Sequence, residues 1–316
     1  FRRDLRTVDN RGLQEALKGD CPVLPLFIFD TEILSQLDDT RDARVQFIHR
    51  EIEDIKHKLE DNYGTSMLIR HGNPLEVWKN LVDEYDIAEV YANRDYETYA
   101  RQRDKSVYEF LEGRDIRFRG FKDHVLLEKS EVLKDDGDPY VVFTPYKKTY
   151  KSLLRDEHFT DYAIYNYTDN FKKSNALDSI ALEEMGFEAF DFEYPGRTIN
   201  REIIENYHNT RDIPAEQGTT RLSMHLRFGT ISIRKLGAIA REANEKYFDE
   251  LIWRDFYQMI LYHFPRSIDN AFREKYDDIA WEKNEEHFEA WCAGKTGYPL
   301  VDAAMRELNT TGWMHN

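Results

Sequence analysis

The chain has 316 residues and a net charge of −16, and 41% of its residues are hydrophobic and 14% aromatic. This length and composition indicate two domains with well-filled cores, and the lack of any run of about 18 apolar residues excludes a transmembrane helix. Cys21 and Cys292 are the only cysteines. They are too few for a CxxC motif or a metal quartet and indicate a reducing cytosol.

The overall acidity argues against a nucleic-acid partner, but the charge is unevenly spread. From Gly218 to Arg266 the chain carries eight Lys and Arg residues against five Asp and Glu residues, a local net charge of +3. Such a segment can face DNA phosphates inside an acidic protein. A chance cluster of cations would give the same count.

Residues 1–128 alternate between strand and helix patterns. The apolar run 22–29 is typical of a strand buried on both faces. The elements that follow are helix 41–60, strand 67–69, helix 74–85, strand 89–92, helix 99–111 and strand 116–118. This alternation predicts an α/β domain with a doubly wound parallel sheet. It contains neither GxGxxG nor GxxxxGK[ST], so no phosphate loop of these types is expected in it.

Residues 129–193 lose the alternation and mix acids with aromatics. We expect a long linker wrapped over the surface and anchored by those aromatics. From about residue 194 the pattern is all-helical, with predicted helices at 199–207, 220–228, 232–244, 247–262, 287–292 and 300–308. The chain opens at Phe1 as if at the end of a strand and closes at Asn316 after an aromatic cluster, so we expect a fragment cut at both ends.

Two segments of the helical half carry chemistry. Gln217–Ser223 places a glycine and several hydroxyls at a helix start, where free N–H groups suit a phosphate. Taken in isolation, an ordinary Thr N-cap explains the segment better. In the predicted helix 247–262, Glu250, Trp253, Arg254 and Tyr257 share one face by their i, i+3, i+4, i+7 spacing. We expect this polar face to look into a cavity. The alternative is a half-buried helix with an i,i+4 Glu–Arg pair.

Five segments, in this order, resemble the photolyase/cryptochrome family over essentially the whole chain. They are Phe1–Arg6 with Asp9 and Asn10, Asp95–Glu97 through Arg103 and Asp104, Gly218–Ser223 with Phe228–Ser232, Glu250–Tyr257, and Gly294–Arg306 with Gly312–Asn316. The pattern is most similar to class I cyclobutane pyrimidine dimer photolyases. The resemblance implies an α/β antenna domain at 1–128, an interdomain linker at 129–193 and a helical FAD- and DNA-binding domain at 194–316, the last one incomplete.

The resemblance also implies an enzyme that repairs UV-damaged DNA in light. Reduced FAD, excited by blue light, would pass an electron to a pyrimidine dimer flipped out of the duplex. Expected catalytic residues are Glu250, Trp253, Asn316 and the electron-relay residue Trp281, for which a core indole is the alternative. Expected FAD contacts are Tyr207, Thr219, Thr220, Arg221, Leu222, Ser223, Tyr247, Glu250 and Arg254. Expected DNA contacts are Arg211, Glu250, Trp253, Arg254, Tyr257 and Asn316.

Two relay tryptophans and the Asn beside the flavin N5 would lie past Asn316. Folate-binding members carry Asn-Glu where this chain has Tyr99 and Ala100, which disfavours a methenyltetrahydrofolate antenna and leaves a deazaflavin, a second flavin or none. A cryptochrome photoreceptor and a (6-4) photolyase are the alternatives; His315-Asn316 is the dimer-photolyase pattern. We expect a monomer in a bacterial-type cytosol or nucleoid, without a membrane partner or a metal.

Overall fold

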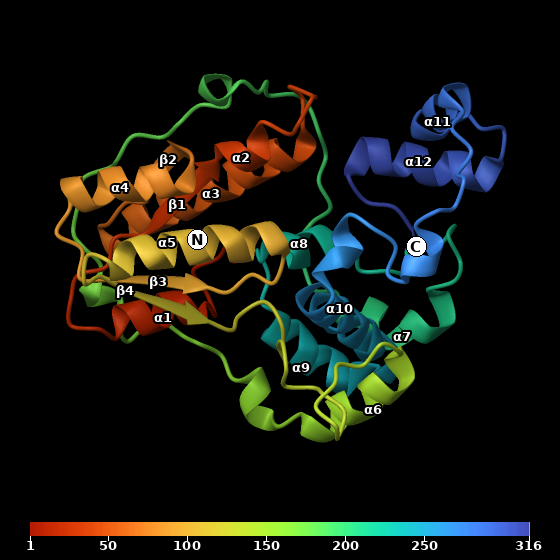
Figure 1. The fold of residues 1–316 in the computed structure, drawn as a ribbon, viewed down its shortest axis with the longest axis horizontal. Coiled ribbons are helices and arrows are strands. Elements are labelled where there is room, and N and C mark those ends of the chain that lie inside the picture. Colours follow the sequence, from red (N-terminus) through yellow and green to blue (C-terminus); the bar gives the residue numbers. More distant parts are fainter. Residues whose placement is uncertain (316) are drawn as a thin grey trace.

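The computed structural model describes residues 1–315 and has an α/β half followed by a helical half (Figure 1). The strands are β1 (Leu26–Asp30), β2 (Leu68–Gly72), β3 (Glu89–Asn93) and β4 (Arg117–Phe121). The helices among them are α1 (Arg11–Leu17), α2 (Thr31–Leu34), α3 (Ala43–Tyr63), α4 (Pro74–Glu84) and α5 (Thr98–Glu112). The predicted α/β class and all four strands are confirmed, whereas α1 and α2 were not predicted.

The strands form two parallel pairs rather than one continuous sheet. β1 pairs with β2 in the register Leu26↔Leu68, and β3 pairs with β4 in the register Glu89↔Arg117. Within residues 1–315, no ladder joins β1 to β3. The predicted parallel direction is confirmed, and a cavity lined by residues of both pairs lies in this half of the molecule.

Local signals fix where the helices begin and end. The carboxylate of Asp42 accepts hydrogen bonds from the first N–H groups of α3, and Gly64, with φ of 60°, ends it. The amide oxygen of Asn73 caps α4, whose first residue, Pro74, needs no N–H partner there. Helix α3 packs Ile52, Leu59 and other apolar residues into a core with β1, and α4 packs Val77 and Leu81 into a second one with β2.

The segment predicted as a linker contains a helix that the sequence pattern did not indicate, α6 (Phe143–Leu153). Its buried side chains Tyr146 and Tyr150 pack into the same core as Phe256 of the helical half. Short 3₁₀ turns follow at η1 (Asp156–Phe159), η2 (Thr168–Asn170) and η3 (Glu183–Met185). The expected aromatic anchors include Phe171 and Phe187, both buried against the α/β half.

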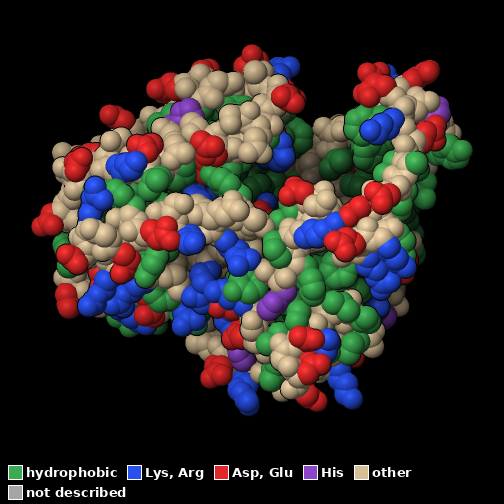
Figure 2. Space-filling model, in the orientation of Figure 1, with side chains coloured by type: hydrophobic (Ala, Val, Ile, Leu, Met, Phe, Trp, Pro, Cys, Tyr) green, Lys and Arg blue, Asp and Glu red, His purple; other side chains and the backbone are tan. Residues whose placement is uncertain are grey.

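The all-helical pattern of the second half is confirmed. Its elements are α7 (Arg201–Thr210), α8 (Ser223–Phe228), α9 (Ile233–Ala243), α10 (Glu245–His263), η4 (Pro265–Ile268), η5 (Glu274–Tyr276), α11 (Glu285–Cys292) and α12 (Pro299–Thr311). Helices α6, α7 and α9 surround α10, whereas α11 and α12 stand apart from this group (Figure 1). Figure 2 shows the molecule hollowed between the α11–α12 pair and the α/β half. Among the described residues, no helix is long and apolar enough to cross a membrane.

A buried cluster of two arginines and two aspartates joins the halves. Arg234 of α9 bonds to Asp9 at 2.8 Å and to Asp123 at 2.8 Å, and Asp123 also accepts from Arg6 at 2.7 Å. Beside it, Gly229 packs so closely that an added Cβ would lie 2.1 Å from the carbonyl oxygen of Arg3. The cluster carries two positive and two negative charges, so the buried ions neutralise one another.

Candidate functional site

Helix α10 positions the residues of the predicted polar face. Its start is fixed by Asn244, whose amide oxygen accepts from the N–H groups of Lys246 and Tyr247 at 3.0 and 3.1 Å. One side of the helix, including Ile252 and Phe256, is buried in the helical core. The opposite side leaves Glu250 and Trp253 partly exposed and Tyr257 57% exposed.

Trp253 is held by aromatic neighbours on the helix and on α6. Its indole stacks on the ring of Phe143 with centroids 3.6 Å apart and an interplanar angle of 8°. Tyr257, one turn along α10, lies against it with centroids 5.6 Å apart at 23°. Trp253 is therefore part of a stack of three aromatic rings, and aromatic rings are the groups on which bases stack. Sequence reasoning missed Phe143, because it lies in the segment interpreted as linker.

Glu250 pairs with Arg211, at the end of α7, and not with Arg254. The guanidinium of Arg211 also lies over the ring of Tyr207, 5.4 Å from its centroid. The i,i+4 Glu–Arg pair considered from the sequence is therefore wrong. His315 Nε2 lies 2.7 Å from the main-chain oxygen of Arg211, so the C-terminal motif reaches the same place.

Arg254 differs from the prediction because its guanidinium turns away from the open side of α10. It donates to the main-chain oxygens of His124 at 2.5 Å and Leu226 at 3.2 Å. Burial, together with the charges of Arg3 and Arg254, lowers the pKa of His124 to about 3, so its ring is neutral at this junction. The contact with His124 joins the two halves, and the expected roles of Arg254 on phosphate and FAD are not supported by its position.

A group of tyrosines and hydroxyls lies beside this surface. Tyr247 is buried, its hydroxyl is 2.8 Å from the Thr220 hydroxyl, and its ring meets Tyr207 edge-on with centroids 5.0 Å apart. The pKa of Tyr247 is raised by burial to about 12, so its phenol is neutral and keeps its proton to donate. The structure thus brings Tyr207, Tyr247 and Thr220, which are far apart in sequence, into one site.

The loop 217–223 has the geometry of a site for an anionic group. Gly218 packs against α7 so tightly that a Cβ would lie 2.5 Å from the Thr210 carbonyl oxygen. Arg221 adopts a left-handed conformation with φ of 53°. Within residues 1–315, no hydrogen bond joins the main-chain N–H groups of 219–223 to a protein acceptor, and α8 has no side-chain N-cap. Free N–H groups at a helix start suit a phosphate, so these residues could hold an anionic group.

The remaining predicted residues lie elsewhere. Trp281 is 74% exposed in the loop before α11, which excludes the core indole considered from the sequence. Asn316 lies outside the described residues.

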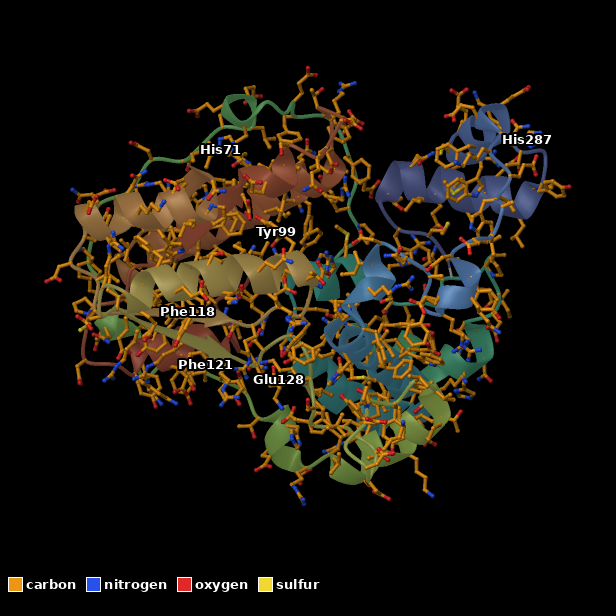
Figure 3. All side chains as sticks on the ribbon, in the orientation of Figure 1. His71, Tyr99, Phe118, Phe121, Glu128 and His287 are labelled. Atoms are coloured by element: carbon orange, nitrogen blue, oxygen red, sulfur yellow. The ribbon has the colours of Figure 1, made fainter. Side chains whose placement is uncertain are left out.

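In the α/β half, the hydroxyl of Tyr99 donates to Asp30 at 2.7 Å, at the carboxyl end of β1 (Figure 3). Near this end, a cavity of about 240 Å³ is bordered by Thr31, His71 and Phe187.

The cationic excess counted at 218–266 does not form a free cationic surface. Six of its eight Lys and Arg residues lie within 4 Å of a carboxylate of the described chain: Arg221, Arg227, Arg234, Arg241, Arg254 and Arg266. Red and blue side chains are accordingly interspersed over the helical half in Figure 2. The predicted DNA-facing charge is therefore reduced by ion pairs that a residue count does not reveal. A cavity of about 1020 Å³ lies in the α/β half, where residues of β1, β3 and β4 line it.

Comparison with known proteins agrees with the fold. The DNA photolyase family model matches residues 1–162, and the FAD binding domain of DNA photolyase matches residues 247–316. The deoxyribodipyrimidine photo-lyase of a Synechococcus strain is 34% identical, over 100% of this chain and 70% of the relative. The enzyme of that name from Escherichia coli is 31% identical, over 100% and 71%.

Solved structures give the same result. A photolyase from Sulfolobus tokodaii, described with two FAD molecules, has a TM-score of 0.79 and 30% identity, covering 100% of this chain and 71% of the other. A class III photolyase from Agrobacterium tumefaciens has a TM-score of 0.85 and 25% identity, covering 100% and 69%. The chain therefore belongs to the DNA photolyase family of DNA-repair lyases.

Proposed function

We propose that this protein splits cyclobutane pyrimidine dimers in UV-damaged DNA, in light, with reduced FAD as its cofactor. The observation that carries the proposal is the convergence of Glu250, Arg211 and the Phe143–Trp253–Tyr257 stack. They lie beside Tyr207, Tyr247 and the hydroxyl of Thr220 in loop 217–223. Electron transfer from a flavin to a flipped base requires such an arrangement, in which a base-stacking surface lies next to an anion site for a dinucleotide.

The residues of this chain would hold FAD in two ways. The free N–H groups and hydroxyls of Thr219–Ser223 would bind its phosphates and ribityl chain, and Tyr207 and Tyr247 would border it. When bound and reduced, FAD would supply the light-excited electron that splits the dimer. Leu222 is buried and fixes the loop; Arg221 is held by Glu307 at 2.9 Å and by the Trp313 ring.

The substrate would meet the exposed side of α10. Trp253, backed by Phe143, would stack on the flipped dimer. Glu250 would accept hydrogen bonds from its base edges, while Arg211, released from Glu250, would bind a backbone phosphate. Asn316 would contribute an amide that both donates and accepts. Dimer splitting needs no proton donor, which fits an Asn in this position and disfavours the (6-4) lesion as substrate.

A second chromophore would lie in the α/β half, at the carboxyl ends of the strands where ligands of such sheets bind. Tyr99 and Ala100 stand where a folate-binding pair is expected, and Tyr99 is bonded to Asp30. We therefore propose a deazaflavin, a second flavin or no antenna, rather than methenyltetrahydrofolate. The protein would act as a monomer on DNA in the cytosol or nucleoid.

The decisive experiment is a light-repair assay on a thymine oligonucleotide that contains one cyclobutane dimer. We expect FAD-loaded, reduced protein to split the dimer into monomers under blue light and to leave the dimer unrepaired in the dark. A reduced, loaded protein that binds this oligonucleotide but never splits the dimer would contradict the proposal and indicate a photoreceptor of the cryptochrome type.

A further inference from the structure

Arg221 connects loop 217–223 with the end of α12. Its guanidinium donates to the Glu307 carboxylate at 2.9 Å and lies over the Trp313 ring, 4.7 Å from the ring centroid. Among the ion pairs of residues 1–315, this is the only one that α12 makes. Helices α11 and α12 stand apart from the other helices in Figure 1, so the contact ties down a helix pair that otherwise packs mainly on itself.

The backbone of Arg221 adopts a conformation that is rare for arginine. Its φ of 53° lies in the left-handed region, which is unfavourable for most residues that carry a Cβ. The residues on either side are bound to another part of the helical half, since the Thr220 hydroxyl lies 2.8 Å from that of Tyr247 and Leu222 is buried. The contacts of the Arg221 side chain with Glu307 and the Trp313 ring offset the cost of this turn and stabilise it.

The groups that hold Arg221 belong to one local unit at the end of α12. Gly312, with φ of 69°, ends the helix. The N–H of Trp313 donates to the Thr311 hydroxyl at 3.2 Å, and this hydroxyl donates to the main-chain oxygen of Glu307 at 2.7 Å. Because the carboxylate and the ring are fixed relative to each other, Arg221 joins the loop to the helix end as a whole.

We propose that Arg221 is a positioning residue for FAD and not one of its ligands. This inference rests on the proposed function, in which loop 217–223 contacts FAD. The guanidinium is already paired with Glu307 and the Trp313 ring, so it fixes the turn of the loop and couples the loop to α12. Coupling between two sites is reciprocal. FAD bound at the loop therefore also orders the end of α12, and breaking the Arg221–Glu307 pair weakens FAD binding.

Glu307→Gln separates this role from a direct contact, because the two roles predict changes of opposite sign. An Arg221 guanidinium that bound FAD phosphate directly would be released from Glu307 and would bind FAD more tightly. A positioning residue would lose its partner, and we expect the dissociation constant for FAD, measured by calorimetry, to rise about twofold to fivefold, the value of one partly exposed ion pair. The matched control is Glu242→Gln, which removes an exposed carboxylate from its ion pair with Arg201 and should leave the constant unchanged.

Arg221→Asn provides a second test, because asparagine tolerates the left-handed turn but makes neither contact with α12. Hydrogen exchange of residues 299–313, followed by mass spectrometry, reports on the helix end. We expect FAD to slow this exchange in the wild type and in Glu242→Gln, and to slow it at least about threefold less in Arg221→Asn.

Three outcomes would overturn the proposal: tighter FAD binding by Glu307→Gln, an unchanged dissociation constant in that variant, or equal slowing of exchange in Arg221→Asn and the wild type. Absence of FAD binding by the wild type would instead contradict the proposed function. The coupling is then judged without FAD, where faster exchange of 299–313 in Arg221→Asn supports it and equal exchange contradicts it.

Discussion

Replacing Asp123 with Asn tests whether the buried cluster joins the two halves. Burial alone would raise the pKa of Asp123, but the charges and hydrogen bonds of Arg6 and Arg234 outweigh it and lower the pKa to about 2. Against an unfolded value of 3.8, the difference is worth about 2–3 kcal/mol at neutral pH, at ~1.4 kcal/mol per pKa unit. The side chain is fully buried, so solvent does not screen this contribution.

Asp123→Asn leaves two buried arginines with the single charge of Asp9, and removing one member of a buried ionic group costs about 3–5 kcal/mol. We therefore expect urea unfolding at pH 7 to show a loss of at least about 2 kcal/mol. The matched control is Asp135→Asn, at an exposed turn, which should change stability by less than ~0.5 kcal/mol.

The pH dependence gives an independent check. Because the folded pKa lies below the unfolded one, the contribution is fully present above about pH 4 and is lost as pH falls toward 2. The difference in stability between wild type and Asp123→Asn should shrink over that window. A loss below about 1 kcal/mol at pH 7, or a difference that does not depend on pH, would refute the reasoning.

Four further predictions concern the proposed activity. Trp253→Ala should weaken binding to dimer-containing DNA by about 1–3 kcal/mol and affect undamaged DNA much less; equal losses in a titration of both would assign it a structural role. Arg211→Gln should weaken binding to both DNAs and reduce the slope of log K against log salt by about 1; an unchanged slope would exclude a phosphate contact. Trp281→Phe should block light-driven reduction of oxidised FAD, followed by absorbance, while repair by chemically reduced protein persists; loss of both would remove it from the relay. Asn316→Asp should slow dimer repair, because a carboxylate would lie beside negative charge developing on the dimer; an Asp variant as fast as wild type, or efficient (6-4) repair by wild type, would contradict the substrate assignment.

Much of the fold could be predicted from local patterns. The strands and α3, α4 and α5 follow from apolar periodicity together with caps such as Asp42 and Asn73, which act within a few residues. Helix α6 could not be predicted this way. It has no side-chain N-cap, and its two buried tyrosines, Tyr146 and Tyr150, are stabilised by contacts with α10, about a hundred residues away.

The site shows the same division between local and distant contacts. Helical spacing placed Glu250, Trp253 and Tyr257 on one side of α10 correctly. The same spacing suggested Arg254 as the partner of Glu250, whereas the partner is Arg211, 39 positions earlier in the chain. Nothing in the local sequence distinguishes these arginines, because the choice depends on how α7 packs against α10 and how α10 meets the α/β half.

The ion pair between Arg211 and Glu250 has a consequence for discrimination between damaged and intact DNA. On the proposed function, a duplex that attracts Arg211 to its phosphates leaves the carboxylate of Glu250 without its cation. A flipped dimer replaces that cation with base-edge donors, whereas an intact duplex offers none and leaves a partly buried charge unpaired. Undamaged DNA would therefore bear a free-energy penalty that the lesion avoids. Selectivity would come from the hydrogen-bond donors that undamaged DNA fails to supply to Glu250, in addition to the contacts that the dimer makes.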